Sequence, residues 1–280
     1  MSRPASALRF GWLAIALSSL ASCGGELIRL GDQSAAESAG GTDGIAGKGS
    51  LSGVAQGGAS AGGGNGPGTD GGAAGSIETC AHRQVLASEV LWIGDSWIQR
   101  PGTQHTRVNE LAIAADTIDE GEDYVNLALD ASSMAVVAKQ YDTRESGATK
   151  VKVILMDGGT WDPIAAQMPN STVSLSAAIA NSVATFQRFL AKVASDGTVE
   201  HIVYFLVPEL APIPGVATMR PQLQEACAAS TVPCHFIDLQ PYWQGHPEFT
   251  AADGIQSSAA GGKVIAELIW GVMQVNCIAQ

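Results

Sequence analysis

Val90-Leu91-Trp92-Ile93-Gly94-Asp95-Ser96-Trp97 is the stretch that decides the fold of this chain. A short apolar run ends abruptly at Gly94, and Asp95 and Ser96 follow it. This pattern predicts a buried parallel strand that delivers a serine to the carboxyl edge of a sheet, which is where open α/β sheets bind ligands. A hydroxyl at that edge can act as a nucleophile only if a base takes its proton. The base is therefore the residue that the rest of the sequence must supply.

Short β-rich apolar runs alternate with longer segments of helical periodicity along the chain. The expected strands are Val90–Ile93, Tyr124–Leu127, Val151–Met156, His201–Val207 and Cys234–Leu239, and the expected helices are Thr106–Asp116, Ser132–Tyr141, Leu175–Ala194, Met219–Ala229 and Ala259–Val275. This alternation predicts an α/β fold of three layers, flavodoxin-like, with a five-stranded parallel sheet in the order 2-1-3-4-5. The strands are almost continuously apolar, as expected when helices cover both faces.

The first 22 residues have the features of a secretion signal. Arg3 and Arg9 give a positive start, and Trp12–Leu20 is an apolar core too short for a permanent membrane span. Small residues then precede Cys23, which resembles the lipobox of bacterial lipoproteins, where the matching cysteine is lipidated. The alternative is an ordinary signal peptide with a chance cysteine. Residues 23–79 are rich in Gly, Ala and Ser, which predicts a disordered tether.

Residues 80–280 are expected to form one domain with a full core. The net charge of the chain is −12, with 27 acidic and 15 basic residues, so nucleic acid is not an expected partner. Four cysteines in an exported domain indicate disulfides, and we predict the pairs Cys80–Cys277 and Cys227–Cys234. Their spacing fits no zinc pattern, so we expect neither a metal nor a cofactor.

Two motifs at opposite ends of the domain carry a family resemblance. Gly94-Asp95-Ser96 resembles the opening block of the SGNH (GDSL) hydrolases, and Asp253-Gly254-Ile255-Gln256 with the small residues after it is similar to their last block, Asp-x-x-His. The resemblance extends over about residues 85–275. It implies ester hydrolysis by a serine nucleophile, a histidine base and an aspartate that orients the histidine. In this family Asp95 mainly supports the loop, so we expect a structural role for it.

The match to the family is uneven at the catalytic positions. Ser96 matches the nucleophile and Asp253 the triad acid, but Gln256 stands where the histidine belongs, and glutamine cannot take up a proton. The resemblance assigns the oxyanion donors to the N–H of Ser96, the N–H of Ala128 in place of a glycine, and the indole of Trp161 in place of an asparagine amide.

Other polar and aromatic residues are candidates for the same edge. His246 precedes Asp253 and is the best alternative base, with an ordinary surface histidine as the competing interpretation. Asp157 and Asp162 are either paired carboxylates or, for Asp162 before Pro163, a helix cap. Three tryptophans are expected to share the ligand edge and to suit sugar stacking, or else to pack in the core: Trp97, Trp161 and Trp243.

The sequence thus predicts a lipid-anchored, exported serine ester hydrolase with a weakened or non-standard site. Its expected ligand is a small acyl ester or an acetylated carbohydrate, and its expected membrane contact is the lipid on Cys23. The alternative is a catalytically inactive protein of the same fold that binds a carbohydrate or another cell-surface ligand, because fold alone does not establish function.

Overall fold

The computed structural model describes residue 80 and residues 84–99, 104–145, 147–211 and 213–279. The predicted signal peptide, Cys23 and all of the predicted tether lie outside these residues, so those interpretations remain predictions. The strands of the described domain are β1 Val90–Ile93, β2 Val125–Asn126, β3 Val153–Met156, β4 His201–Leu206 and β5 Cys234–Asp238.

Helices alternate with these strands, as the apolar periodicity predicts. The longer helices are α2 Gln104–Ala114, α3 Met134–Glu145, α5 Leu175–Asp196, α6 Val216–Ala228 and α8 Ala259–Val275. Short elements lie in the connections: η1 Ala87–Glu89, α1 Ser96–Gln99, α4 Trp161–Ala166, α7 Gln240–Trp243 and η2 Pro247–Phe249. None of these short elements was predicted, because three to six residues are too few to show a helical repeat.

The strands form one parallel sheet in the order β2-β1-β3-β4-β5, which confirms the predicted topology. Because β2 lies on one side of β1 and β3 on the other, the chain changes winding direction at the end of β1. In sheets of this kind, ligands bind outside the carboxyl ends of the strands at that point. Ser96 follows β1 directly, so the topology places it at the expected ligand edge.

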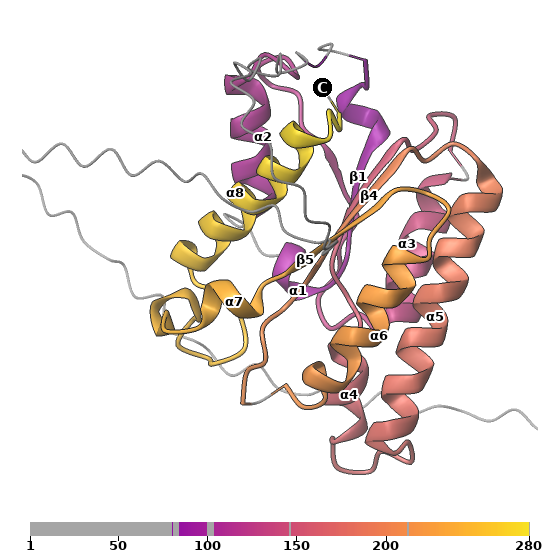
Figure 1. Cartoon of the computed structure of the whole chain (residues 1–280), viewed down its shortest axis with the longest axis vertical. Helices are drawn as coiled ribbons and strands as arrows, with labels where there is room; N and C mark the ends of the chain where they lie inside the picture. Colours follow the sequence, from indigo (N-terminus) through magenta and orange to yellow (C-terminus); the bar gives the residue numbers. More distant parts are fainter. Residues whose placement is uncertain (1–79, 81–83, 100–103, 146, 212, 280) are drawn as a thin grey trace, which may run out of the picture. The chain divides into compact units, whose positions relative to one another are not determined.

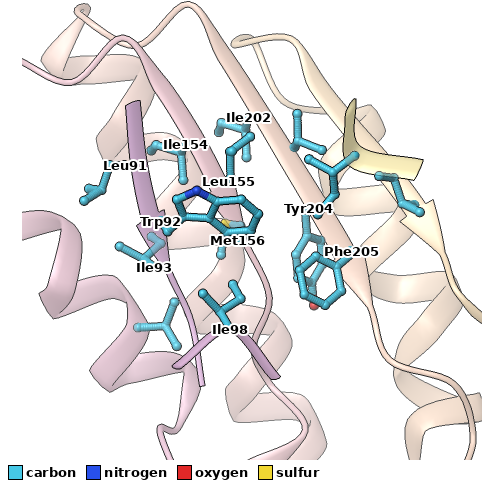
Figure 2. Close-up of a cluster of buried hydrophobic side chains, with 14 of the residues drawn as sticks. Leu91, Trp92, Ile93, Ile98, Ile154, Leu155, Met156, Ile202, Tyr204 and Phe205 are labelled. Carbon is cyan, nitrogen blue, oxygen red and sulfur yellow. The ribbon is translucent and has the colours of Figure 1, made fainter. Parts of the chain in front are cut away.

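Helices cover both faces of the sheet (Figure 1). On one face α2 packs against α8, and on the other α3, α5 and α6 pack side by side. All side chains of β1 and β3 are fully buried between these layers. Figure 2 shows Trp92 of β1 among Ile154 and Leu155 of the neighbouring strand β3. This double burial explains why the strands are continuous apolar runs in the sequence.

The two longest helices have their ends marked by local capping contacts. The Ser174 hydroxyl accepts a hydrogen bond from the N–H of Ala177 at the start of α5, and Gly197 ends that helix with φ +69°. Ser258 begins α8 by accepting from the N–H of Gly261. Serine before a helix and glycine after it satisfy the unpaired backbone groups at the helix ends, which makes these boundaries readable in the sequence.

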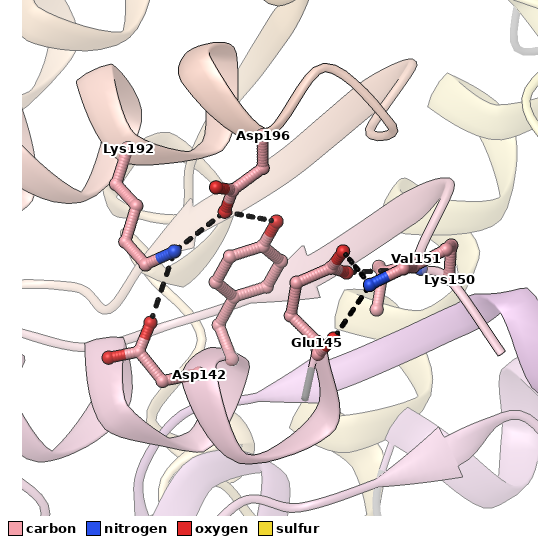
Figure 3. A network of polar contacts seen from close by, with 7 residues as sticks. Asp142, Glu145, Lys150, Val151, Lys192 and Asp196 are labelled. Atoms are coloured by element: carbon pink, nitrogen blue, oxygen red, sulfur yellow. Dashed lines mark hydrogen bonds and ion pairs between the residues drawn. The ribbon is translucent and has the colours of Figure 1, made fainter. Parts of the chain in front are cut away.

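A polar network joins α3 to α5 (Figure 3). The Lys192 ammonium lies 2.7 Å from Asp196 and 3.5 Å from Asp142, and the Tyr141 hydroxyl donates to Asp196 at 3.0 Å. The hydrogen bond from Lys192 holds the pKa of the Asp196 carboxyl below its ordinary value. Lys192 and Asp142 are about half exposed, so their ion pair contributes little to stability, whereas the Tyr141 side chain is buried.

Both predicted disulfides are present, Cys80–Cys277 and Cys227–Cys234. Disulfides persist in oxidising compartments and are rare in the cytosol, so the pair indicates an extracytoplasmic protein. Within the described residues, no helix has the length and apolar character needed to cross a bilayer.

Candidate active site

The loop that carries Ser96 turns sharply at Gly94, where φ is +156°. A Cβ atom on Gly94 would lie 1.8 Å from the Oδ1 atom of Asp157, at the end of β3. That oxygen accepts a hydrogen bond from the N–H of Asp95 at 2.7 Å. The glycine is therefore required both by the backbone conformation and by the close approach of a carboxyl group.

Gln140 of α3 holds the same loop from the other side. Its Oε1 atom accepts from the N–H of Gly94 at 2.7 Å, and its Nε2 atom donates to the carbonyl oxygen of Gly94 at 2.9 Å. The Gln140 side chain is buried, and its Nε2 atom lies 3.3 Å from the hydroxyl of Ser132, to which it also donates. A two-point amide clamp of this kind fixes the residues just before the serine.

The hydroxyl of Ser96 contacts two side chains. Gln256 Nε2 donates to the Ser96 oxygen at 2.8 Å, and the Ser96 hydroxyl donates to Asp95 Oδ1 at 3.1 Å. The structure thus brings together the first and the last of the motif blocks, as the family resemblance predicts. Whichever way the amide of Gln256 is turned, it cannot take up the proton of the serine.

The last motif block is organised by Asp253. Its Oδ1 atom accepts hydrogen bonds from the backbone N–H groups of Ile255 and Gln256, both at 2.9 Å, so the carboxylate shapes the turn that aims Gln256 at the serine. Gly261 follows at the start of α8, where a Cβ atom would lie 2.3 Å from the carbonyl oxygen of Phe249. This close approach explains why position 261 is a glycine.

Asp95 and Asp157 form a buried pair of acids behind the serine. Burial raises the pKa of Asp95 from 3.8 to about 6. Burial and the neighbouring Asp95 charge raise the pKa of Asp157 well above 3.8. The sequence suggested Asp157 and Asp162 as the pair, but Asp157 bonds to the backbone of Asp95. Two acids this close do not both ionise readily in a low-dielectric interior.

Asp162 has a different role from the predicted helix cap. Its Oδ2 atom accepts from the N–H of Met134 at 2.8 Å, so it holds the start of α3 rather than the start of α4. Thr160 precedes α4 and makes no side-chain capping bond. Instead its hydroxyl lies 3.4 Å from Asp95 Oδ2 and donates to it. The loop after β3 is therefore tied to both the serine loop and α3.

The predicted oxyanion donors differ in their hydrogen bonds and in their exposure. The N–H of Ala128 donates to Asn126 Oδ1 at 3.0 Å, so it would have to leave that oxygen to bind an oxyanion. Trp161 is partly exposed at the first position of α4. These assignments, including the N–H of Ser96, remain predictions.

The described histidines have other partners than Ser96. His246, the alternative base, is exposed, lies 2.9 Å from Glu248 and stacks on Phe249. His105 bonds to the carbonyl oxygen of Tyr124 at 2.9 Å. His201 and His235 lie 3.3 Å apart at the opposite, amino edge of the sheet, on the two neighbouring strands β4 and β5. A catalytic role for His246 receives no support from these contacts and stays a prediction.

Trp97 and Trp243 pack together in the core, with ring centroids 5.7 Å apart, and both are almost completely buried. The interpretation as core residues therefore holds for these two, and Trp161 alone among the three keeps exposed surface. Sugar stacking at this edge would depend on Trp161.

The sequence pattern does not predict the roles of Gln140 and Thr160 or the pairing of Asp95 with Asp157. Only Asp157 gave a signal, a carboxyl group directly after four apolar strand residues. Gln140 lies in an ordinary helical repeat, and its role depends on the fold. In the described part of the chain, no three His, Cys, Asp or Glu side chains gather as a metal site would require.

Comparisons with known proteins identify the fold. No protein-family model and no curated protein matches the chain. Among solved structures, it is similar to LAE5, an alpha/beta hydrolase enzyme from the metagenome of Lake Arreo, with a TM-score of 0.55, 17% identity, and coverage of 71% of this chain and 99% of that one. It is also similar to Axe2, an acetylxylan esterase from Geobacillus stearothermophilus, with a TM-score of 0.54 and 15% identity. This match covers 69% of this chain and 96% of Axe2. The domain has the α/β fold of these hydrolases and esterases.

Proposed function

We propose that this protein is an extracytoplasmic serine ester hydrolase of the SGNH type, with Ser96 as the nucleophile. The observation that carries the proposal is the contact between Ser96 and Gln256, which brings the first and last motif blocks within 2.8 Å. Ser96 also lies at the sheet edge where the topology predicts ligand binding. The fold neighbours LAE5 and Axe2 are a hydrolase and an esterase, which agrees with the proposal.

The Axe2 structures support the comparison of the motifs. Variants of Axe2 described as catalytic mutants replace a serine, an aspartate and a histidine, and the last two are three positions apart. Asp253 and Gln256 have the same spacing here. We therefore propose an acylated carbohydrate or a small acyl ester as the substrate, with Ser96, Asp253 and Gln256 at the three catalytic positions.

Hydrolysis of p-nitrophenyl acetate and of acetylated xylo-oligosaccharides by the full chain tests this function. We expect slow turnover that disappears in Ser96→Ala, with the melting temperature unchanged. Equal rates in the wild type and in Ser96→Ala would contradict the proposal.

One observation favours a second candidate, a non-catalytic ligand-binding protein. Gln256 replaces the histidine that the resemblance expects, and its buried Oε1 atom has no hydrogen-bond partner in the described structure. A hydroxyl or amide of a bound ligand would satisfy this acceptor. Binding of acetylated xylo-oligosaccharides without any release of acetate, measured by calorimetry, would support this candidate instead.

The membrane anchor is a separate proposal that rests on the sequence around Cys23. We expect the full chain to incorporate labelled palmitate in a bacterial host and to fractionate with membranes. Cys23→Ser should lose both properties. Equal labelling of the two proteins would contradict lipidation at this cysteine.

A further inference from the structure

With the Nε2 atom of Gln256 facing Ser96, the chemistry of the two partners determines where the proton of the Ser96 hydroxyl points. The Nε2 group of Gln256 is a donor only, so it occupies a lone pair of the serine oxygen at 2.8 Å. An ionised carboxylate is an acceptor only, so the hydroxyl proton lies on the line to Asp95 Oδ1, at 3.1 Å. The serine therefore already donates its proton toward a carboxylate.

Asp95 is held rigidly for this contact. Its Oδ1 atom also accepts from the N–H of Trp97 at 3.2 Å, and its Oδ2 atom accepts from the hydroxyl of Thr160 at 3.4 Å. Only 4% of the residue is exposed. A fixed carboxylate next to the hydroxyl meets the geometric requirement for a general base, which is hydrogen-bond reach of the proton that it removes.

We propose that Asp95 is the general base of Ser96 and takes the part that histidine plays in the related motif. This inference rests on the proposed ester hydrolysis and deepens it, because it names the group that activates the nucleophile. It also changes the expected role of Asp95, which the family resemblance assigns mainly to loop support.

The proton transfers balance with Asp95 as the only shuttle. The Ser96 proton moves to Asp95 Oδ1 as the serine oxygen bonds to the ester carbonyl carbon. Cleavage of the bond to the alkoxy oxygen then releases the alcohol, which takes the proton from Asp95. In the second half, water gives a proton to Asp95 and attacks the acyl carbon, and the serine oxygen leaves and recovers that proton.

Gln256 acts in these steps as a fixed donor. Its Nε2–H group stabilises the negative charge that develops on the serine oxygen, as an oxyanion donor does for a carbonyl oxygen. It moves no proton itself.

The electrostatic surroundings agree with this assignment. Burial raises the pKa of Asp95 to about 6, so the group is ionised at neutral pH and is a stronger base than an exposed carboxylate. The other titratable groups of this site are Asp157, Tyr204 and Asp162, and burial raises the pKa of all three. Burial thus favours the uncharged form of each of these groups.

Phosphonylation of Ser96 by a fluorophosphonate probe, followed by mass spectrometry, tests the inference without requiring turnover. We expect Asp95→Asn to lower the labelling rate by at least about 100-fold, with Asp130→Asn, an exposed carboxyl in the loop after β2, as the matched control. The wild-type rate should fall as pH drops below about 6, and Asp95→Asn should lack this acid limb.

Adding a second base beside Ser96 distinguishes a chemical role of Asp95 from a structural one. In a Gln256→His background, where the imidazole can take the proton, Asp95→Asn should cost less than about tenfold. Any of three outcomes would overturn the inference. The labelling rate could fall equally in both backgrounds, or the wild-type rate could stay constant with pH. The third outcome is a fall in His246→Ala as large as that in Asp95→Asn. Labelling without ester turnover would contradict the proposed function alone, whereas turnover that survives Asp95→Asn would contradict the inference alone.

Discussion

The Nε2 atom of Gln256 lies 2.8 Å from the hydroxyl oxygen of Ser96, although 160 positions separate the two residues in the sequence. A histidine at position 256 would bring its ring to the same place, and the ring could accept the proton that the amide cannot. Under the proposed function, the base that the resemblance expects is missing through the change of one side chain at a position that already contacts the serine.

Gln256→His should raise kcat/KM for p-nitrophenyl acetate by at least about tenfold, because a positioned general base contributes about 10²–10⁴-fold to such reactions. Gln256→Met, which has a similar size but neither donates nor accepts through nitrogen or oxygen, should lower the rate. The gain should vanish in the double variant Gln256→His/Ser96→Ala. A folded Gln256→His protein without any gain would contradict the prediction that the missing histidine limits the rate.

Gly94→Ala should destabilise the domain by about 3–5 kcal/mol, because it combines an unfavourable backbone angle with a clash against Asp157 Oδ1. Gly121→Ala is the matched control, since Gly121 has φ +90° but no atom within 4 Å of the added carbon. It should cost only the strain, about 1–3 kcal/mol. Urea unfolding measures both, and similar losses would mean that the carboxyl of Asp157 can move aside.

Asp157→Asn should change how stability depends on pH. The folded state holds the proton of Asp157 to a higher pH than the unfolded state, so the free energy of unfolding falls as pH rises above 3.8. Asp95 contributes a further decrease in the free energy of unfolding, which ends near pH 6. Because Asp157→Asn lacks the part of this loss that comes from Asp157, its free energy of unfolding should fall less than that of the wild type as pH rises from 4.5 to 7.5.

Urea unfolding of the two proteins at pH 4.5, 6 and 7.5 measures this difference, and Glu120→Gln, at an exposed position, serves as the control. Parallel curves for the wild type and Asp157→Asn would show that Asp157 ionises at its ordinary pH.

The two disulfides should stabilise the domain unequally. Cys80–Cys277 spans 197 positions and Cys227–Cys234 only 7, and a longer closed loop restricts the unfolded chain more. Replacing the two cysteines of the first bond by serine should lower the free energy of unfolding by about 5 kcal/mol. The same change at the second bond should lower it by about 2–3 kcal/mol. Denaturant unfolding of the two double variants gives the comparison, and the reverse order would contradict an entropic origin.

The centre of the sheet was predictable because β1 and β3 are buried on both faces. β1 and β3 leave no polar position to confuse the pattern, and β1 has the predicted bounds. β2 is shorter than predicted, and at its start the N–H of Tyr124 bonds to the Asn109 side chain instead of to a strand. The longest helices were predictable from their apolar stripes. Helix α8 has the predicted bounds, from residue 259 to residue 275.

The site was predictable only where a motif names the residue. The motif blocks identify Ser96, Asp253 and Gln256, and the topology places the serine. The partnership of Asp95 and Asp157 has no sequence signature, because it depends on the backbone angle at Gly94 and on the register of β1 against β3. The positions of Gln140 and Thr160 follow from the packing of α3 and of the loop after β3, which no local pattern encodes.

The Cys80–Cys277 bond has a topological consequence. With Cα atoms 5.3 Å apart, it joins the two ends of the domain and makes the backbone between them a covalent ring. A protease that cuts one surface loop opens this ring without releasing a fragment. The nicked domain therefore keeps all its strands attached to one another until a reductant breaks the sulfur bridge.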